Sequence, residues 1–146
     1  MKWSLRLLVV CFSVMFVTVS SHANDNPPTP EDKAFKFRTS LFQTFSWKLG
    51  QMAGAKAADD EAAFTKHQND LVYLSSMLEE GFKIKNSIPE GSDAKPEIWE
   101  DYEGFKAKVA NMETRTKALS MSDFDPREFG SKACGSCHRD FRVKRN

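Results

Sequence analysis

The C-terminal segment KACGSCHRDFRVKRN holds the residues whose types and spacing could do chemistry. Cys134, Cys137 and His138 fall within five consecutive positions. Two thiols and an imidazole at this spacing occur in redox dithiols, in zinc sites and in haem attachment through thioethers. The remainder of the chain has to discriminate among these three chemistries.

The N-terminal segment resembles an export signal. Lys2 and Arg6 form a basic start, an apolar run covers 7–19, and small residues lead to Ala23. This pattern predicts a signal peptide, residues 1–23, that is cleaved after Ala23. A membrane anchor is the alternative, but the apolar run is shorter than the roughly 20 residues that a bilayer requires. We therefore expect one mature domain, residues 24–146, in the periplasm.

Cleavage would leave a mature chain with few cysteines and little net charge. Cys11 would be lost, so two of the three cysteines would remain, both in the C-terminal cluster. Loss of Lys2 and Arg6 would change the formal charge from +1 to −1. This balance, without a long run of one sign, gives no reason to expect nucleic acid or an anionic membrane as a partner.

Four amphipathic segments predict an all-α chain. The first begins at Thr29, where Pro30 and Asp32 complete a helix start signal. Its expected inward positions are Phe35, Arg38, Phe42, Phe45, Leu49 and Met52. The second runs from about Asp60 to Phe82, with its apolar stripe at Phe64, Leu71, Leu74, Leu78 and Phe82.

The loop NSIPEGSDAKPE separates the second segment from the third. The third has apolar or small residues in steps of three and four at Ile98, Tyr102, Phe105, Val109, Met112, Thr116 and Leu119. The fourth is predicted to open with a capping box at Asp125, Pro126 and Glu128 and to run into the cysteine cluster. No alternating run of strand length is present, so a sheet is not expected. Four amphipathic helices, three of them joined by modest loops, predict an antiparallel four-helix bundle.

These features favour haem over the other two chemistries. A redox dithiol prefers its first thiol at a helix N-terminus beside a sheet, and here the pair is expected inside a helix. A zinc site needs further ligands, and the other histidine of the mature chain, His67, has no cysteine near it. On a helix, Cys134 and Cys137 suit two vinyl groups of one porphyrin edge, and His138 can turn its ring under the iron. Export also fits, because thioether attachment is made outside the cytoplasm.

The chain resembles the class II cytochromes c, and in particular the cytochrome c' family. The resemblance rests on PEDKAFKFRTS, on GSDAKPEIWEDYEGFKAKV and on CGSCHRDFR, and it covers nearly all of the mature chain. It implies a four-helix bundle with one covalently attached haem c, bound through Cys134 and Cys137, with His138 as the axial ligand of the iron.

The resemblance also assigns roles to three further residues. Aligning KFR with the first-helix motif of the family makes Phe42 the residue over the distal face of the haem; its alternative is an ordinary core aromatic. Arg38 is expected to hold the haem propionates rather than extend to solvent. Arg142, one turn after His138, is expected to border the proximal imidazole; its alternative is an ordinary basic helix end.

These assignments imply a five-coordinate iron that binds small gases, nitric oxide and carbon monoxide in particular, with a possible role as nitric oxide carrier, buffer or sensor. Phenylalanine cannot ligate iron, and Met52 lies about 15 Å further along the same helix. An electron carrier with redox partner proteins is the alternative. Enzymatic turnover is not expected, because no distal acid or base is apparent beside Phe42. The resemblance also implies a homodimer, for which Trp47 and Leu41 were expected to form an exposed apolar patch.

Overall fold

The computed structural model describes residues 27–144. The predicted signal peptide, residues 1–23, lies outside this range. The described helices are α1 (Pro30–Ala57), α2 (Glu61–Ser76), a 3-10 turn η1 (Leu78–Phe82), α3 (Glu97–Glu100), α4 (Tyr102–Lys117), α5 (Pro126–Phe129), a π-helical turn η2 (Gly130–Cys134) and α6 (Gly135–Phe141). No helix within this range is both long enough and apolar enough to cross a bilayer.

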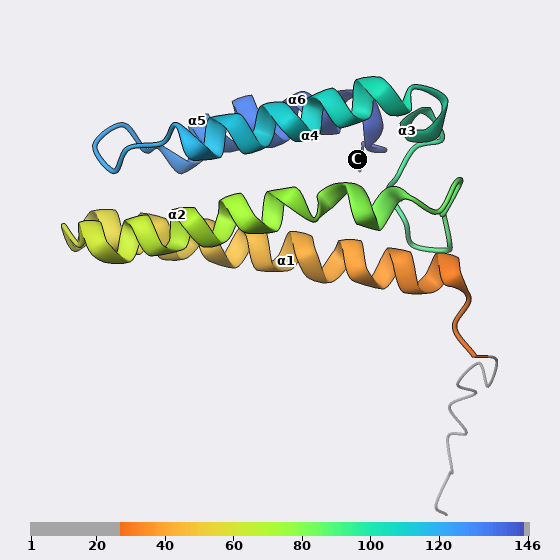
Figure 1. Cartoon of the computed structure of the whole chain (residues 1–146), viewed down its shortest axis with the longest axis horizontal. Helices are drawn as coiled ribbons and strands as arrows, with labels where there is room; N and C mark the ends of the chain where they lie inside the picture. Colours follow the sequence, from red (N-terminus) through yellow and green to blue (C-terminus); the bar gives the residue numbers. More distant parts are fainter. Residues whose placement is uncertain (1–26, 145–146) are drawn as a thin grey trace, which may run out of the picture.

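The helices form an antiparallel four-helix bundle, as predicted (Figure 1). The long helices α1 and α2 lie side by side as one layer. The second layer consists of α4 and the interrupted helix α5–η2–α6, and α2 packs against α4. Within residues 27–144 the β-type pairing is limited to an isolated antiparallel bridge between Ala94 and Arg142.

The start of α1 follows the predicted capping box. The Asp32 backbone N–H donates to the Thr29 hydroxyl, and the Thr29 backbone N–H donates to the Asp32 carboxylate. Pro30 occupies the first helical position, where a missing N–H costs nothing. At the other end, Asp59 adopts a φ of 53°, and Asp60 caps α2 by accepting from the Ala63 N–H. This tight turn makes α1 and α2 antiparallel neighbours.

The predicted second, third and fourth helices are interrupted. The second continues beyond α2 as the 3-10 turn η1, and the third breaks at Asp101, which caps α4 through the Gly104 N–H. Asp125 caps α5 as expected, by accepting from the N–H groups of Arg127 and Glu128. The reciprocal bond of a capping box is absent among the bonds recorded there, and the Glu128 carboxylate accepts from Lys132.

The inward side of α1 differs in register from the prediction. Leu41, expected on an exposed patch, is 6% exposed and belongs to the core. Phe42, expected on the inward stripe, is 40% exposed. The stripe that the bundle buries therefore follows Arg38, Leu41, Phe45, Met52 and Ala55. Phe42 lies beside this stripe rather than in it, so the protein leaves part of its ring uncovered, where a bound cofactor could contact it.

The buried residues form two clusters. The larger joins α1, α2 and the start of the fourth helix, and it includes Phe45, Met52, Phe64, Leu71, Phe124, Phe129 and Ala133. The smaller consists of Phe82, Ile98, Phe105 and Phe141, and Cys137 packs against it. The cysteine motif thus lies next to both clusters, because Ala133, which precedes Cys134, belongs to the first and Cys137 contacts the second.

Candidate functional site

The cysteine motif occupies the junction between η2 and α6. Cys134 ends the π-helical turn, and Cys137 and His138 follow within α6. A π-helical turn carries one residue more than an α-helical turn, and such turns are frequent at functional sites. Here the turn ends at the first cysteine, so Cys134 lies in the π-helical turn and Cys137 in the α-helix that follows it.

Both cysteines are free, partly buried thiols. Burial raises the pKa of the Cys134 thiol, and burial raises the pKa of Cys137 to about 11. Because the thiolate is the nucleophile in dithiol exchange, raised pKa values disfavour that chemistry. The environment therefore weakens the redox-dithiol hypothesis and is compatible with thiols that form thioethers.

The rings of His138 on α6 and Phe42 on α1 approach one another edge to face. Their ring centroids are 6.4 Å apart, with an angle of 67° between the ring planes. Phe42 also contacts Phe45, at 6.2 Å between centroids. The structure therefore brings together the two residues that were predicted for opposite faces of the haem.

The imidazole of His138 is partly buried. Burial, and secondly the charge of Arg142, lower the pKa of this imidazole. An axial histidine ligand must be neutral to offer its nitrogen lone pair to a metal. The surroundings of His138 therefore favour the form of the side chain that ligates iron.

Arg142 has a partner that the sequence did not reveal. Its Nε and Nη2 donate to the same Asp93 carboxylate oxygen at 3.3 and 3.0 Å. The Asp93 carbonyl accepts from the Val143 N–H, and the Lys95 N–H donates to the Phe141 carbonyl. These bonds attach the loop before α3 to the end of α6. The guanidinium thus lies close enough to affect His138 while it is paired with the loop.

Arg38 lies on the buried side of α1, as predicted, but its recorded partners are neutral. Its side chain donates to the Gly81 carbonyl and to both the hydroxyl and the carbonyl of Ser87. Burial lowers the pKa of the guanidinium. No carboxylate within residues 27–144 forms a recorded ion pair with it, although a buried charge is costly without a counter-charge. A haem carboxylate would supply that counter-charge.

Sequence reasoning missed Gly81, Ser87 and Asp93. A segment with proline and glycine follows Ser87, and these residues predict a turn there rather than a buried contact. Gly81 fell inside a segment predicted as continuous helix. No pattern within the sequence indicates that these residues contact Arg38 or Arg142, because the contacts join positions more than 40 residues apart.

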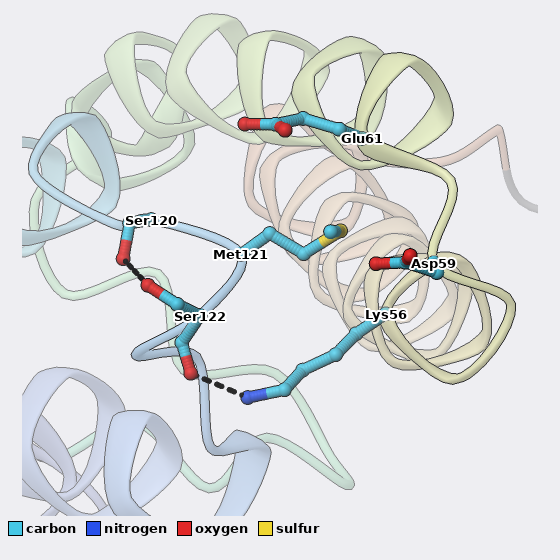
Figure 2. A pocket seen from close by; sticks show the side chains of 6 residues that line it. All are labelled: Lys56, Asp59, Glu61, Ser120, Met121 and Ser122. Atoms are coloured by element: carbon cyan, nitrogen blue, oxygen red, sulfur yellow. Dashed lines mark hydrogen bonds between the residues drawn. The ribbon is translucent and has the colours of Figure 1, made fainter.

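A surface hollow lined mostly by polar residues lies at the other end of α1 (Figure 2). Its volume is about 420 Å³, and its lining includes Lys56, Asp59, Glu61 and Met121. Lys56 donates to the carbonyls of Ser122 and Phe124, so its charge serves to fix the loop before α5. Lys56 is about 21 Å along α1 from Phe42 at 1.5 Å per residue. This hollow is therefore separate from the cysteine motif.

Comparison with known proteins identifies the family. The family model described as Cytochrome C' matches residues 33–142, from the first turn of α1 to the end of α6. The chain belongs to the cytochrome c' family. The cytochrome c' of Halomonas halodenitrificans is 27% identical over 131 residues, covering 79% of this chain and 98% of that protein. A cytochrome c-554 of Cereibacter sphaeroides is 32% identical over 108 residues, covering 66% of this chain and 70% of that protein.

Solved structures agree on the fold. The structure of cytochrome c prime from Shewanella frigidimarina superposes with a TM-score of 0.64 at 22% identity, covering 82% of this chain and all of that one. Family membership decides among the three chemistries: the cofactor is covalently attached haem c, and Cys134 and Cys137 fit its Cys-x-x-Cys-His attachment motif. The residues of the site fit this group, because they offer two free thiols, an imidazole and an uncovered aromatic ring.

Proposed function

We propose that the protein is a periplasmic haem protein that binds small gases at a five-coordinate iron. His138 is the single axial ligand from the protein, and Phe42 covers the opposite face. The observation that carries this proposal is the edge-to-face approach of Phe42 to His138, with 6.4 Å between the ring centroids. Residues 24–146 form the haem domain, and residues 1–23 direct its export.

Phe42 determines which ligands the distal side favours. Haem c supplies an iron that can bind a diatomic gas on the face away from its histidine. The phenyl ring offers no hydrogen-bond donor, and bound dioxygen depends on such a donor because it accumulates negative charge. Nitric oxide and carbon monoxide depend on it far less, and they are therefore the expected ligands. The same ring must move aside for entry, which makes binding slow.

Gas titration of the purified, reduced protein tests this function. We expect saturable binding of carbon monoxide and nitric oxide, with one ligand per haem, and no stable dioxygen complex. Binding of neither gas at millimolar concentration would contradict the proposal.

Arg142 and Arg38 are expected to line the two sides of the haem. Substitution of either arginine by glutamine is expected to alter the affinity for the gas without releasing the cofactor.

Electron transfer is the alternative function. A carrier of this family would place a second ligand, such as methionine, opposite the histidine. Met52 is completely buried, and the other methionines of the described segment, Met77, Met112 and Met121, pack against the same larger cluster. Met52 also lies about 15 Å further along α1 than Phe42, at 1.5 Å per residue. These positions favour an open sixth position, and redox partners would then serve only to keep the iron reduced.

Catalytic turnover is not part of the proposal. The ring contacts recorded for Phe42 are with Phe45 and His138, and neither supplies an acid or base on the distal side. Proton transfer to a bound ligand would need a titratable group within hydrogen-bond reach. We therefore propose a binding role rather than an enzymatic one.

A homodimer is proposed through the outer face of α1 and α2. Trp47 is 57% exposed and Tyr73 is 69% exposed, whereas Leu41 is buried and no longer part of this surface. The edge of the Trp47 ring meets His67, at 6.2 Å between centroids, and Lys48 lies over the indole at 4.9 Å. A large aromatic side chain held in one orientation, as Trp47 is here, is typical of the residues that anchor protein interfaces.

Sedimentation velocity checks the dimer. At micromolar concentration we expect the native protein to sediment as a dimer and Trp47→Ala to shift it towards monomer, with a loss of about 2 kcal/mol or more of association free energy. Val143→Ala, at another exposed apolar position, is the matched control and should leave the dimer intact. A native protein that sediments only as monomer would refute this interface.

A further inference from the structure

Arg38 is held more tightly than a residue that merely completes the core. Its side chain is 4% exposed, and three donated hydrogen bonds fix both terminal nitrogens. Nη1 donates to the Gly81 carbonyl at 2.8 Å and to the Ser87 hydroxyl at 3.1 Å, and Nη2 donates to the Ser87 carbonyl at 2.7 Å. The planar guanidinium therefore has one defined orientation.

Ser87 is itself fixed in place. It is fully buried although it lies in the loop between η1 and α3. Its hydroxyl accepts from Arg38 and donates to the Glu31 carbonyl at 3.1 Å. The hydroxyl thus acts both as an acceptor and as a donor, and it joins the loop, the first turn of α1 and the guanidinium.

Gly81 confines the stem of Arg38 from the other side. A Cβ atom at Gly81 would lie 2.6 Å from Cγ of Arg38 and 3.1 Å from the ring of Phe37. The Phe82 ring stacks below the guanidinium at 4.8 Å from its central carbon. Any side chain at position 81 would therefore push Arg38 out of its present position.

We propose that Ser87 and Gly81 are positioning residues that hold the Arg38 guanidinium where it acts as the counter-charge of a haem carboxylate. This inference rests on the proposed haem role of Arg38. The three recorded bonds leave Nε and one hydrogen of Nη2 without a recorded acceptor within residues 27–144. These donors are free to meet a carboxylate while the neutral bonds set the orientation of the fork.

The reduction potential of the holoprotein reports on this arrangement. A cation near haem favours the reduced form, because reduction lowers the positive charge at the iron. Displacing the guanidinium should therefore raise the ratio of oxidised to reduced protein at a fixed electrode potential. We expect a rise of roughly threefold for Ser87→Ala and for Gly81→Ala, and a larger one for Arg38→Gln, since a small displacement weakens a charge interaction that removal abolishes.

Two controls separate positioning from stability. Ser75→Ala removes another fully buried serine hydroxyl, one that donates to the Leu71 carbonyl within α2 and forms no recorded bond with Arg38. Gly54→Ala adds a methyl group on α1 where nothing lies within 4 Å. Spectroelectrochemistry on all five variants should show an unchanged ratio for both controls, whatever their melting temperatures.

The outcomes distinguish this inference from the function on which it rests. If the ratio of oxidised to reduced protein changes in Arg38→Gln but not in Ser87→Ala or Gly81→Ala, the positioning role is wrong and the haem role of Arg38 stands. If the ratio changes in none of the three variants, both roles are wrong. Equal shifts in Ser87→Ala and Ser75→Ala would mean that loss of any buried hydroxyl moves the potential, and this too would overturn the inference.

Discussion

Replacement of both Cys134 and Cys137 by alanine is expected to abolish covalent haem. These are the only thiols after residue 23 in the sequence, and both are free and partly buried on one segment of the fourth helix. Each single variant keeps one possible thioether and should retain haem less securely. Acid-acetone extraction followed by a haem stain of the denatured protein measures the attached fraction directly.

Ser136→Ala is the matched control for the double variant. Ser136 lies between the two cysteines, and its hydroxyl donates only to the Ala133 carbonyl one turn earlier. Its removal should leave covalent haem at the native level. Haem that resists extraction in the double variant would show that the attachment does not depend on this motif.

Phe42→Ala is expected to accelerate carbon monoxide binding to the reduced protein. The phenyl ring faces His138, and its removal opens the distal side without touching the proximal ligand. We expect an increase of about tenfold in the association rate constant, which corresponds to about 1.4 kcal/mol of barrier. Stopped-flow mixing measures it. Since Phe42 is 40% exposed, the loss of stability should be smaller than for a core aromatic.

Phe45→Ala provides the comparison one turn along the same helix. Phe45 is buried in the larger cluster and contacts Phe42. Its truncation should lower the free energy of unfolding by roughly 3 to 5 kcal/mol, as large-to-small core substitutions do, while the carbon monoxide rate stays nearly unchanged. If Phe42→Ala instead behaves like Phe45→Ala, Phe42 is a core residue, and the sterically gated site is wrong.

The sequence was sufficient to predict the helical bundle, because its signals are local. The caps at Thr29, Asp60 and Asp125 depend on side chains within three residues of the backbone groups that they satisfy. The breaks at Asp101 and within the fourth helix were not predicted. The break at Asp101 has a local cause, because its side chain accepts from the Gly104 N–H, but apolar periodicity does not report a cap inside a continuous stripe. The π-helical turn has no side-chain cap at its start, so no comparable local signal marks it.

The candidate site was predictable to the extent that it lies in one segment. Cys134, Cys137 and His138 are close in sequence, so their spacing reduced the site to three chemistries, and the export signal, the helical pattern and the family resemblance favoured haem. The exchange of Leu41 and Phe42 between the buried and exposed sides shows where periodicity fails, since adjacent residues differ by only 100° around a helix. The partners of Arg38 and Arg142 are Gly81 in η1 and Ser87 and Asp93 in the loop that follows, and only the folded chain reveals these long-range contacts.

The optical spectrum of the purified holoprotein tests the central claim most directly. If His138 is the only axial ligand from the protein, both the oxidised and the reduced forms should show the bands of high-spin, five-coordinate haem, and carbon monoxide should convert the reduced form to a low-spin spectrum. Low-spin bands of histidine-methionine haem in the absence of added ligand, unchanged by carbon monoxide, would contradict the account and identify the protein as an electron carrier.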